Sequence, residues 1–320
     1  MKFFNIDLHI SVIEDIKFIF KELGHEVTSW NLSSHNWVFG RNPTSVDIVN
    51  QNTWKYIDQN MCDSFYERYK NDLSEYDGFI ACYPTAFALL YEKFDKPIYI
   101  VVATRYEHPF SSDENRWSWF DGKLKDMIDN GKVIPIANNR YDKMYCEYFL
   151  DREFKHIPNI CSYTESKYNP QFDPIVSGRI KINGLKHISD LGRFNWNDLY
   201  GHRAIVHIPY NVSIMSIFEQ YTAGVPLLFP SPELCMSIKG SMSELFFRPN
   251  CRVDSYSKED ILLSDFYDKE WMPFIKQFSC IQELVHFTDD TKVLNEISEN
   301  MKKFNEERQS RIHKLWSSII

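Results

Sequence analysis

The segment that decides the fold is MKFFNIDLHISVIEDIKFIFKELGHEVTSW, residues 1–30. Its pattern predicts a strand over 2–8, then a helix, then a second strand over 26–30. Apolar residues recur at helical spacing between 12 and 23, so one stripe of the helix can be buried. Two strands joined by a helix through such short links favour a right-handed crossover between parallel strands. The segment therefore predicts a Rossmann-type beginning.

Chemical signals mark both ends of this helix. Ser11 and Glu14 have the S-x-x-E spacing of a capping box, in which each side chain binds an exposed backbone N–H of the first turn. Gly24 is the residue type that commonly ends a helix. We therefore expect the helix to begin at Val12 and to stop at Gly24.

The same alternation continues to about residue 170. Strands are expected over 78–82, 98–103, 133–137 and 156–162, and helices over 86–94 and 142–150. The run over 98–103 is apolar throughout, which is typical of parallel strands covered on both faces. One doubly wound domain is predicted over residues 1–170.

The polar segment 165–174 contains two prolines and suits a connector, so we place a hinge there. A second Rossmann-like domain is predicted over 171–290. It has strands over 175–177, 204–209 and 225–229 and a helix over 216–222. The pattern over residues 291–320 predicts a long charged helix, or two helices, packing across the domains. The prediction is an α/β protein in which two doubly wound domains face each other across a cleft, closed by a C-terminal helix.

Composition narrows the class of protein. The chain has 320 residues, more than one hydrophobic core usually organises, so length favours two domains and leaves a single large α/β domain open. Its 36 basic and 44 acidic side chains give a net charge of -8, which disfavours nucleic acid as a partner. The seven cysteines are scattered without a C-x-x-C pair, so we expect them to be reduced and mostly buried. No signal peptide or membrane span is recognisable, and a cytoplasmic location is expected. Peripheral membrane contact and the oligomeric state stay open.

The most informative segment is HIPYNVSIMSIFEQYTAGVPLLFPSPE, residues 207–233. A strand ends at Pro209, and a helix begins between Ser213 and Ser216. The N–H groups and the positive dipole end of that helix would face the crevice beyond the carboxyl end of the strand. This geometry suits a diphosphate. Glu219, one turn into the helix, could accept hydrogen bonds from both hydroxyls of a ribose, or be an ordinary solvated glutamate.

The segment resembles the donor-binding motif of GT-B glycosyltransferases, an E-x(7)-E run followed by a small residue, Gly, a β-branched residue and Pro. Phe218-Glu219-Gln220 and Ala223-Gly224-Val225-Pro226 match its second half. The resemblance implies that Glu219 binds the donor ribose. It also implies that the backbone near Ser213, Met215 and Ser216 binds the diphosphate.

The first half of the motif departs from the family. Asn211 stands eight residues before Glu219, where the family has its first glutamate, and the glycines are also replaced. That glutamate contacts the transferred sugar in the family, so the stereochemistry of the reaction stays open. Asn211 could still hydrogen-bond a sugar hydroxyl.

Two further segments agree with the family in order and spacing. Pro158-Asn159 resembles the Pro-Asn that closes the first domain, and implies a place beside the donor. Ser177-Gly178-Arg179 resembles a strand-Gly-Arg motif whose arginine neutralises donor phosphates. The lysine that the family carries a few residues later could be Lys181 or Lys186.

The first domain of the family often has a histidine just after a central strand, facing the bound sugar. Here the loop 104–108 contains Arg105, Glu107 and His108. His108 could donate to a sugar hydroxyl or move a proton, and Glu107 could instead be the base. Arg105, His9 and Ser11 are expected on the acceptor side of the cleft.

The resemblance implies transfer of a hexose or N-acetylhexosamine from a UDP- or GDP-linked sugar to a hydroxyl of a carbohydrate or glycoconjugate acceptor. No cofactor and no metal are expected, because Arg179 and the helix N-terminus would stabilise the leaving diphosphate. Two alternatives remain. One is a nucleotide-sugar epimerase of the same fold, and the other is a non-catalytic partner protein that binds nucleotide sugar. The base, the sugar and the acceptor stay open.

Overall fold

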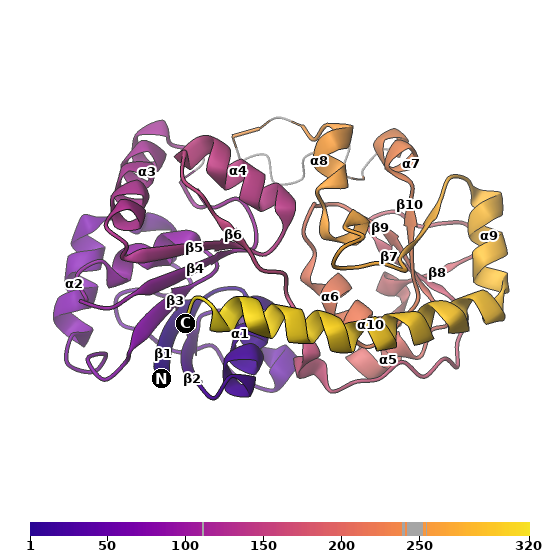
Figure 1. Cartoon of the computed structure of the whole chain (residues 1–320), viewed down its shortest axis with the longest axis horizontal. Helices are drawn as coiled ribbons and strands as arrows, with labels where there is room; N and C mark the ends of the chain where they lie inside the picture. The colour runs from indigo at the N-terminus through magenta and orange to yellow at the C-terminus, as the bar shows by residue number, and fades with distance from the viewer. Residues whose placement is uncertain (111, 239–240, 242–251, 254) are drawn as a thin grey trace. The chain divides into compact units, whose positions relative to one another are not determined.

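The structure is a computed structural model that describes residues 1–320 except 111, 239–240, 242–251 and 254. The chain divides into two compact units, each built on its own parallel sheet (Figure 1). The first comprises Met1–Pro158 and, further along the chain, Arg252. The second comprises the rest of the described chain. The predicted hinge segment 165–174 therefore lies inside the second unit, where the N–H groups of Asn169 and Gln171 bind the carbonyls of Tyr200 and Gly201.

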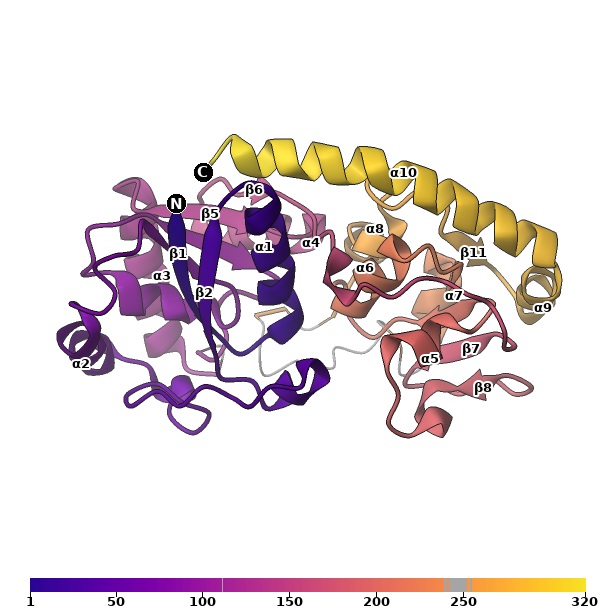
Figure 2. The same cartoon turned by 90° about the horizontal axis from the view of Figure 1, so that it is seen from below.

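The first unit has a six-stranded parallel sheet in the order β2-β1-β3-β4-β5-β6. Its elements are β1 (Lys2–Asp7), α1 (Ile10–Glu22), β2 (Glu26–Asn31), the 3-10 helices η1 (Ser34–Phe39) and η2 (Trp54–Tyr56), α2 (Gln59–Tyr69), β3 (Gly78–Ala81), the 3-10 helix η3 (Thr85–Tyr91), β4 (Ile98–Val102), α3 (Glu114–Asp129), β5 (Val133–Ala137), α4 (Arg140–Leu150) and β6 (Lys155–His156). Helix α1 lies on one side of the β1–β2 edge, and α2 and α3 lie on the other (Figure 2). The sheet is therefore covered on both faces, as its apolar strands require.

The predicted Rossmann-type beginning is confirmed. Strands β1 and β2 pair in parallel over their whole length, with α1 between them in the chain. The predicted capping box is wrong, because α1 begins at Ile10 with His9 as its N-cap and no side chain caps it. The carboxylate of Glu14 instead binds Lys17 at 2.9 Å and Arg41 at 2.7 Å.

Two other elements of the first unit differ from those that the sequence predicts. The helix predicted over 86–94 is the 3-10 helix η3, which ends at Tyr91. Tyr91 is fully buried, stacks on Phe79 at 4.4 Å and accepts a hydrogen bond from the Ile6 N–H. The strand predicted over 156–162 is reduced to the two residues of β6.

The second unit has a five-stranded parallel sheet in the order β11-β10-β9-β7-β8. Its elements are the 3-10 helix η4 (Ser162–Thr164), β7 (Ile175–Gly178), β8 (Lys186–His187), the 3-10 helix η5 (Ile188–Leu191), α5 (Trp196–Tyr200), β9 (Ile205–Ile208), α6 (Met215–Thr222), β10 (Leu227–Pro230), α7 (Pro232–Ser237), α8 (Lys258–Leu262), the 3-10 helix η7 (Asp265–Tyr267), β11 (Lys276–Phe278), α9 (Ile281–Asp289) and α10 (Thr291–Ser317). The expected strand-helix-strand order around residues 204–229 is confirmed. The unit is a second Rossmann-like domain.

The predicted long C-terminal helix is α10, with 27 residues. Its Arg308 is fully buried and packs against α6, with the guanidinium 5.7 Å from the ring centre of Phe218 and 5.5 Å from that of Tyr221. Arg308 donates hydrogen bonds to the carbonyl of Asn159 and, at 3.3 Å, to the hydroxyl of Thr222. Helix α10 therefore fastens the C-terminal end of α6. Packing across the two domains stays a prediction.

The cysteines of the described chain form no disulfide bonds. Five of the six are buried, as expected, and Cys280 is exposed; Cys251 lies outside the described residues. Among the helices that the structure describes, none combines the length and the apolar character needed to span a membrane.

Candidate functional site

Each sheet has one point where the strand order reverses. In the first unit β1 lies between β2 and β3, and in the second unit β7 lies between β8 and β9. Open parallel sheets bind ligands beyond the carboxyl ends of the strands at such a point. The candidate sites are therefore the loops that follow β1 and β3 in the first unit, and those that follow β7 and β9 in the second.

A close approach between β7 and β9 forms the site of the second unit. Gly178, the last residue of β7, pairs with Ile208, the last residue of β9. Its φ is 137°, and a Cβ atom there would lie 2.4 Å from the carbonyl oxygen of Ile208. Arg179 follows, with its guanidinium carbon 5.1 Å from the ring centre of Tyr210. The structure thus brings the predicted phosphate-binding arginine to the loop that leads from β9 to α6.

Gly178→Ala tests this close approach. The methyl group would collide with a backbone carbonyl, and the φ value is strained for any residue with a Cβ, so we expect a loss of about 2–4 kcal/mol in the free energy of unfolding. Urea denaturation followed by circular dichroism measures it. Gly192→Ala is the matched control, because Gly192 also has a positive φ of 66° but has no atom within 4 Å of its added methyl group. Equal losses for the two variants would contradict the steric argument.

The loop after β9 ends at the N-terminus of α6. This helix begins at Met215, and its N-cap residue is Ile214, whose side chain cannot cap it. The Ser213 hydroxyl is buried and has no hydrogen-bond partner in the part of the chain that the structure describes. First-turn N–H groups lack partners within their helix, and the dipole makes this end positive. Ser213, Met215 and Ser216 therefore lie at a helix N-terminus of the kind that stabilises anions. Their contact with a diphosphate stays a prediction.

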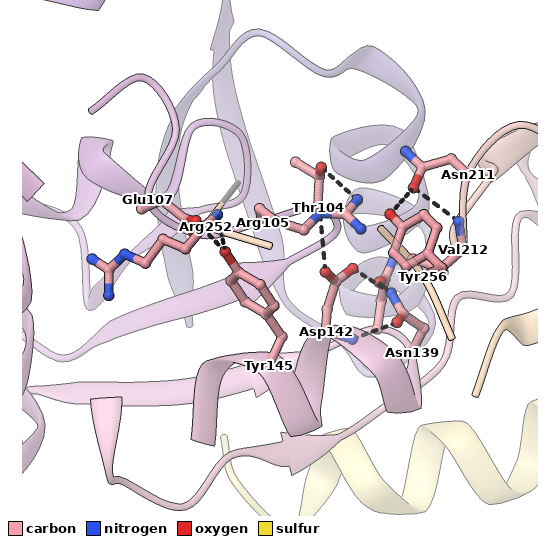
Figure 3. A network of polar contacts seen from close by, with 11 residues as sticks. Thr104, Arg105, Glu107, Asn139, Asp142, Tyr145, Asn211, Val212, Arg252 and Tyr256 are labelled. Atoms are coloured by element: carbon pink, nitrogen blue, oxygen red, sulfur yellow. Dashed lines mark hydrogen bonds and ion pairs between the residues drawn. The ribbon is translucent and has the colours of Figure 1, made fainter. Parts of the chain in front are cut away.

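Glu219 and Asn211, in contrast, bind neighbours within the second unit. One carboxylate oxygen of Glu219 accepts a hydrogen bond from the Tyr163 hydroxyl, and the other accepts one from the Trp196 indole at 3.0 Å. Glu219 is only 7% exposed. The amide oxygen of Asn211 accepts from the Val212 N–H at 2.8 Å and from the Tyr256 hydroxyl at 3.2 Å (Figure 3). Protein donors thus occupy the carboxylate for which ribose hydroxyls were predicted.

The two candidate lysines lie at different ends of the sheet. Lys186 begins β8 and pairs with Ile175 at the amino end of β7, whereas Arg179 follows the carboxyl end. Lys186 is therefore not brought to Arg179. Lys181 remains nearer in sequence, and its ammonium group lies 2.8 Å from the carboxylate of Asp190.

Pro158 and Asn159 lie where the first unit ends and the second begins. The Asn159 carbonyl is bound by Arg308, and the adjacent Ile160 carbonyl is bound by the Thr222 hydroxyl. These contacts give the segment a structural role at the C-terminal end of α6. A contact with the donor stays a prediction.

A buried carboxylate organises the site of the first unit. Asp7, the last residue of β1, accepts hydrogen bonds from the N–H groups of His9 at 2.7 Å, Cys82 at 3.1 Å and Tyr83 at 3.0 Å. Burial raises the pKa of Asp7 to about 6, against the lowering effect of these bonds. Asp7 thereby ties the loops after β1 and β3 together at the point where the strand order reverses.

Aromatic rings surround the two predicted histidines of this unit. The His108 ring stacks on the Tyr83 ring, with 5.3 Å between the ring centres and 7° between the planes. Its centre lies 5.2 Å from that of the Trp54 ring. The centre of the His9 ring lies 6.1 Å from that of the same Tyr83 ring, so the structure brings both histidines to one tyrosine. Burial lowers the pKa of both to about 4, and both are therefore neutral near pH 7. Neither Nδ1 atom has a hydrogen-bond partner among the described residues.

Glu107 belongs to a separate buried network. It accepts a hydrogen bond from the Tyr145 hydroxyl, which in turn accepts the Arg252 N–H at 2.8 Å (Figure 3). The Arg252 guanidinium donates to Asp121 at 2.8 Å and lies 4.1 Å from the Trp117 ring centre. Burial raises the pKa of Glu107 to about 7. The Glu107 side chain has no exposed surface and is held within this network, which gives it structural contacts. A role as the base stays a prediction.

The remaining predicted residues of the first unit are Arg105 and Ser11. Arg105 is buried, donates to the Thr104 hydroxyl at 2.9 Å and lies 3.6 Å from the Asp142 carboxylate (Figure 3). Asp142 is held in turn by Asn139 at 2.6 Å. Ser11 is half-buried in the first turn of α1. Arg105 therefore anchors the loop after β4 to α4.

The sequence reasoning missed Asp7, Tyr83 and Trp54 in the first unit and Tyr210 in the second. Asp7, Tyr83 and Tyr210 each end or closely follow a strand, which is a usable signal once the strand order is known. Trp54 had no such signal, because η2 lies far from any strand in the chain. In the described chain, no group of three or more His, Cys, Asp or Glu side chains is arranged to hold a metal ion.

Comparisons with known proteins test the fold. No family model and no curated protein matches the sequence. A sucrose-phosphate synthase from Thermosynechococcus elongatus matches with a TM-score of 0.56 and 10% identity, over 100% of this chain and 98% of that chain. The glycosyltransferase SnogD from Streptomyces nogalater matches with a TM-score of 0.46 and 13% identity, over 99% of this chain and 98% of that chain. The spinosyn rhamnosyltransferase SpnG, complexed with thymidine diphosphate, matches with a TM-score of 0.43 and 9% identity, over 95% of this chain and 96% of that chain.

The sucrose-phosphate synthase match covers both parallel-sheet units of this chain, and its TM-score is above 0.5. At 10% identity it shows the fold and not the reaction. It agrees with the resemblance carried by residues 158–159, 177–179 and 218–226. The chain therefore has the GT-B glycosyltransferase fold.

Proposed function

We propose that this protein is a glycosyltransferase that moves a hexose or N-acetylhexosamine from a nucleoside-diphosphate sugar to a hydroxyl group of a carbohydrate or glycoconjugate, without a metal ion. One observation carries the proposal. Gly178 lets β7 end against β9, and this places Arg179 beside Tyr210 in the loop that leads to the N-terminus of α6. An arginine and a helix N-terminus at the reversal point of a parallel sheet make a site for a diphosphate.

The donor side has to stabilise the negative charge that forms on the leaving diphosphate. When the bond between the sugar and the diphosphate breaks, negative charge grows on the leaving oxygen. A guanidinium can bind two phosphate oxygens at once, and the helix N-terminus adds fixed N–H dipoles directed at the same charge. Donors arranged before the reaction stabilise the transition state without further reorganisation. Arg179 and α6 would supply this stabilisation.

On the acceptor side, we assign the hydroxyl to the surroundings of His108. Its neutral imidazole can accept a hydrogen bond from a hydroxyl, and Tyr83 holds the ring in place by stacking. A pKa of about 4 makes His108 a weak base at pH 7, so its first task would be to orient the acceptor. Proton transfer would follow only as the hydroxyl becomes acidic during bond formation.

A panel of nucleotides and nucleotide sugars tests the proposal. Calorimetric titration with UDP, GDP and thymidine diphosphate is expected to show binding of at least one. Incubation with the matching nucleotide sugars should then release free nucleoside diphosphate slowly, because water can replace the acceptor. Absence of binding by every nucleotide would contradict the proposal. A changed sugar still attached to its nucleotide would instead identify an epimerase.

A non-catalytic nucleotide-sugar-binding protein is the second candidate, and a specific observation favours it. The carboxylate of Glu219 is bound by Tyr163 and Trp196, and Asn211 replaces the family's first glutamate. Such a protein would bind a nucleoside diphosphate but would leave every nucleotide sugar intact with any acceptor. Binding without turnover would therefore select this candidate.

A further inference from the structure

A hollow lies in the second unit, at the opposite end of its sheet from Arg179. It has a volume of about 970 Å³, and its lining includes Pro174, Lys186 and Arg203, which precede or begin β7, β8 and β9. Arg179 follows the other end of β7, and a four-residue strand rises by about 13 Å. The hollow is therefore a feature separate from the candidate diphosphate site.

The charges around this hollow are balanced. Three basic side chains and three acidic side chains line it, namely Lys186, Arg193, Arg203, Asp173, Asp198 and Asp289. Arg203 and Asp173 pair directly at 2.7 Å. An equal number of opposite charges gives neither an anion nor a cation a net electrostatic advantage. Charged oxygens and nitrogens of both kinds can, however, hydrogen-bond the hydroxyls of a neutral ligand.

Apolar surface lies next to these polar groups. Phe172 lines the hollow and is 52% exposed, and Phe194 and Leu191 line it too. The backbone holds Phe172 in place, because the N–H groups of Gln171 and Phe172 both bind the Gly201 carbonyl, at 2.7 and 2.9 Å. A Cβ atom on Gly201 would lie 3.1 Å from the Phe172 ring. The ring is thus fixed against the backbone with part of its surface open.

His202 adds a buried polar group to the same wall. It is 3% exposed and lines the hollow, and its ring lies 5.4 Å from that of Phe172. A carbonyl oxygen can only accept, so the Nδ1 atom of His202 donates to the Asp173 carbonyl at 2.5 Å, and this bond orients the ring. Among the described residues, its Nε2 atom makes no hydrogen bond. An oriented imidazole ring therefore stands beside an open aromatic ring.

We propose that this hollow binds a neutral oligosaccharide. A sugar ring has an apolar face of C–H groups, which packs on an aromatic ring, and a rim of hydroxyls, which both donate and accept hydrogen bonds. Phe172 supplies the aromatic surface, and the charged side chains of the lining together with His202 supply hydrogen-bond partners for hydroxyls. The volume lies at the upper end of the range for small-molecule sites, so more than one ring fits. The site is independent of the reaction proposed above.

The test is titration of the full chain with neutral tetrasaccharides, without nucleotide. Maltotetraose, cellotetraose, chitotetraose and mannotetraose are each added up to ~10 mM, a concentration that detects dissociation constants in the millimolar range. Binding of at least one is expected by calorimetry. Phe172→Ala should weaken it by about tenfold or more, since loss of a stacked ring costs on the order of 1.4 kcal/mol. Phe172→Leu, which keeps an apolar side chain over Gly201 but removes the flat ring, should weaken it as well.

Phe274→Ala is the matched control. Phe274 is a phenylalanine of the same unit, is 40% exposed and does not line the hollow, so its loss should leave oligosaccharide affinity unchanged. The proposal is overturned if no tetrasaccharide binds, or if both Phe172 variants retain the affinity of the unmodified protein. It is also overturned if Phe274→Ala weakens binding as much as Phe172→Ala. Nucleoside diphosphate affinity should be the same in all of these variants, which separates this site from the donor site.

Discussion

Replacing Arg179 with alanine is expected to lower kcat/KM for the donor sugar by about 100- to 1,000-fold, the effect of removing one preorganised donor to developing negative charge. The affinity for the nucleoside diphosphate should fall by about ten- to a hundredfold, because charge-assisted hydrogen bonds contribute ~1.5–3 kcal/mol. Arg179 is an exposed residue outside any strand or helix, so the variant should fold normally. Steady-state kinetics and calorimetry on the same preparation measure the two effects.

Arg179→Lys and Lys181→Ala are the controls. Lysine keeps the charge but cannot bind two phosphate oxygens in a planar fork. The affinity and kcat/KM of Arg179→Lys should therefore lie between those of Arg179→Ala and of the unmodified protein. Lys181, the remaining candidate for the family's lysine, lies two residues away and pairs with Asp190, so Lys181→Ala should lower the affinity less than Arg179→Ala does. If Arg179→Ala binds nucleotides as tightly as the unmodified protein, the diphosphate site lies elsewhere and the proposed function loses its main support.

The sequence predicted the two Rossmann-like domains because their signals are local. Apolar spacing within residues 1–30 and 204–229 depends on neighbours a few positions apart, and the structure has the expected strands and helices there. The Gly178-Arg179 pair was also recognisable. A glycine is the one residue without a Cβ to collide with the Ile208 carbonyl, so the chemical reason for the motif is visible in the geometry.

The errors arose where a residue's partner lies far away in the chain. Glu14 has the spacing of a capping box, but Arg41, on the loop after η1, takes its carboxylate. Lys186 lies close to Arg179 in sequence, yet a strand parallel to β7 must begin at the opposite end of the sheet. The two-residue strand β8 gave no sequence signal, so this return of the chain could not be foreseen.

The same limit applies to the residues that complete the candidate sites. Asp7 joins β1 to the loop after β3 through N–H groups more than seventy residues along the chain. Tyr163 and Trp196 hydrogen-bond Glu219 from segments that precede it in the chain and show no clear hydrophobic periodicity. Predicting these contacts requires the order of the strands, which local periodicity does not contain.

Helix α6 links the candidate donor site to the packing of the second unit. Its N-terminus lies at the end of the loop that contains Tyr210, and its C-terminal residue Thr222 contacts Arg308 of α10. A short helix keeps its N–H groups aimed at a phosphate only if its other end is fixed. We therefore expect residues of α10 to affect the donor site without contacting a ligand there.

Arg308→Met is expected to lower the free energy of unfolding by about 2–4 kcal/mol. Methionine fills much of the same volume but cannot donate hydrogen bonds, so the Asn159 carbonyl and the Thr222 hydroxyl would lose a buried donor. Guanidinium denaturation followed by tryptophan fluorescence measures the loss. Hydrogen exchange should show faster opening of the α6 amides, because α10 no longer holds the C-terminal end of that helix.

Arg311→Met separates this effect from the loss of any arginine on α10. Arg311 is 34% exposed, pairs with Glu270 at 2.8 Å and lies over the Trp271 ring, so its removal should cost less than about 1 kcal/mol. Exchange of the α6 amides should stay unchanged in this variant. If Arg308→Met destabilises the protein no more than Arg311→Met, the buried hydrogen bonds of Arg308 do not hold α6, and the N-terminus of that helix owes its position to the sheet alone.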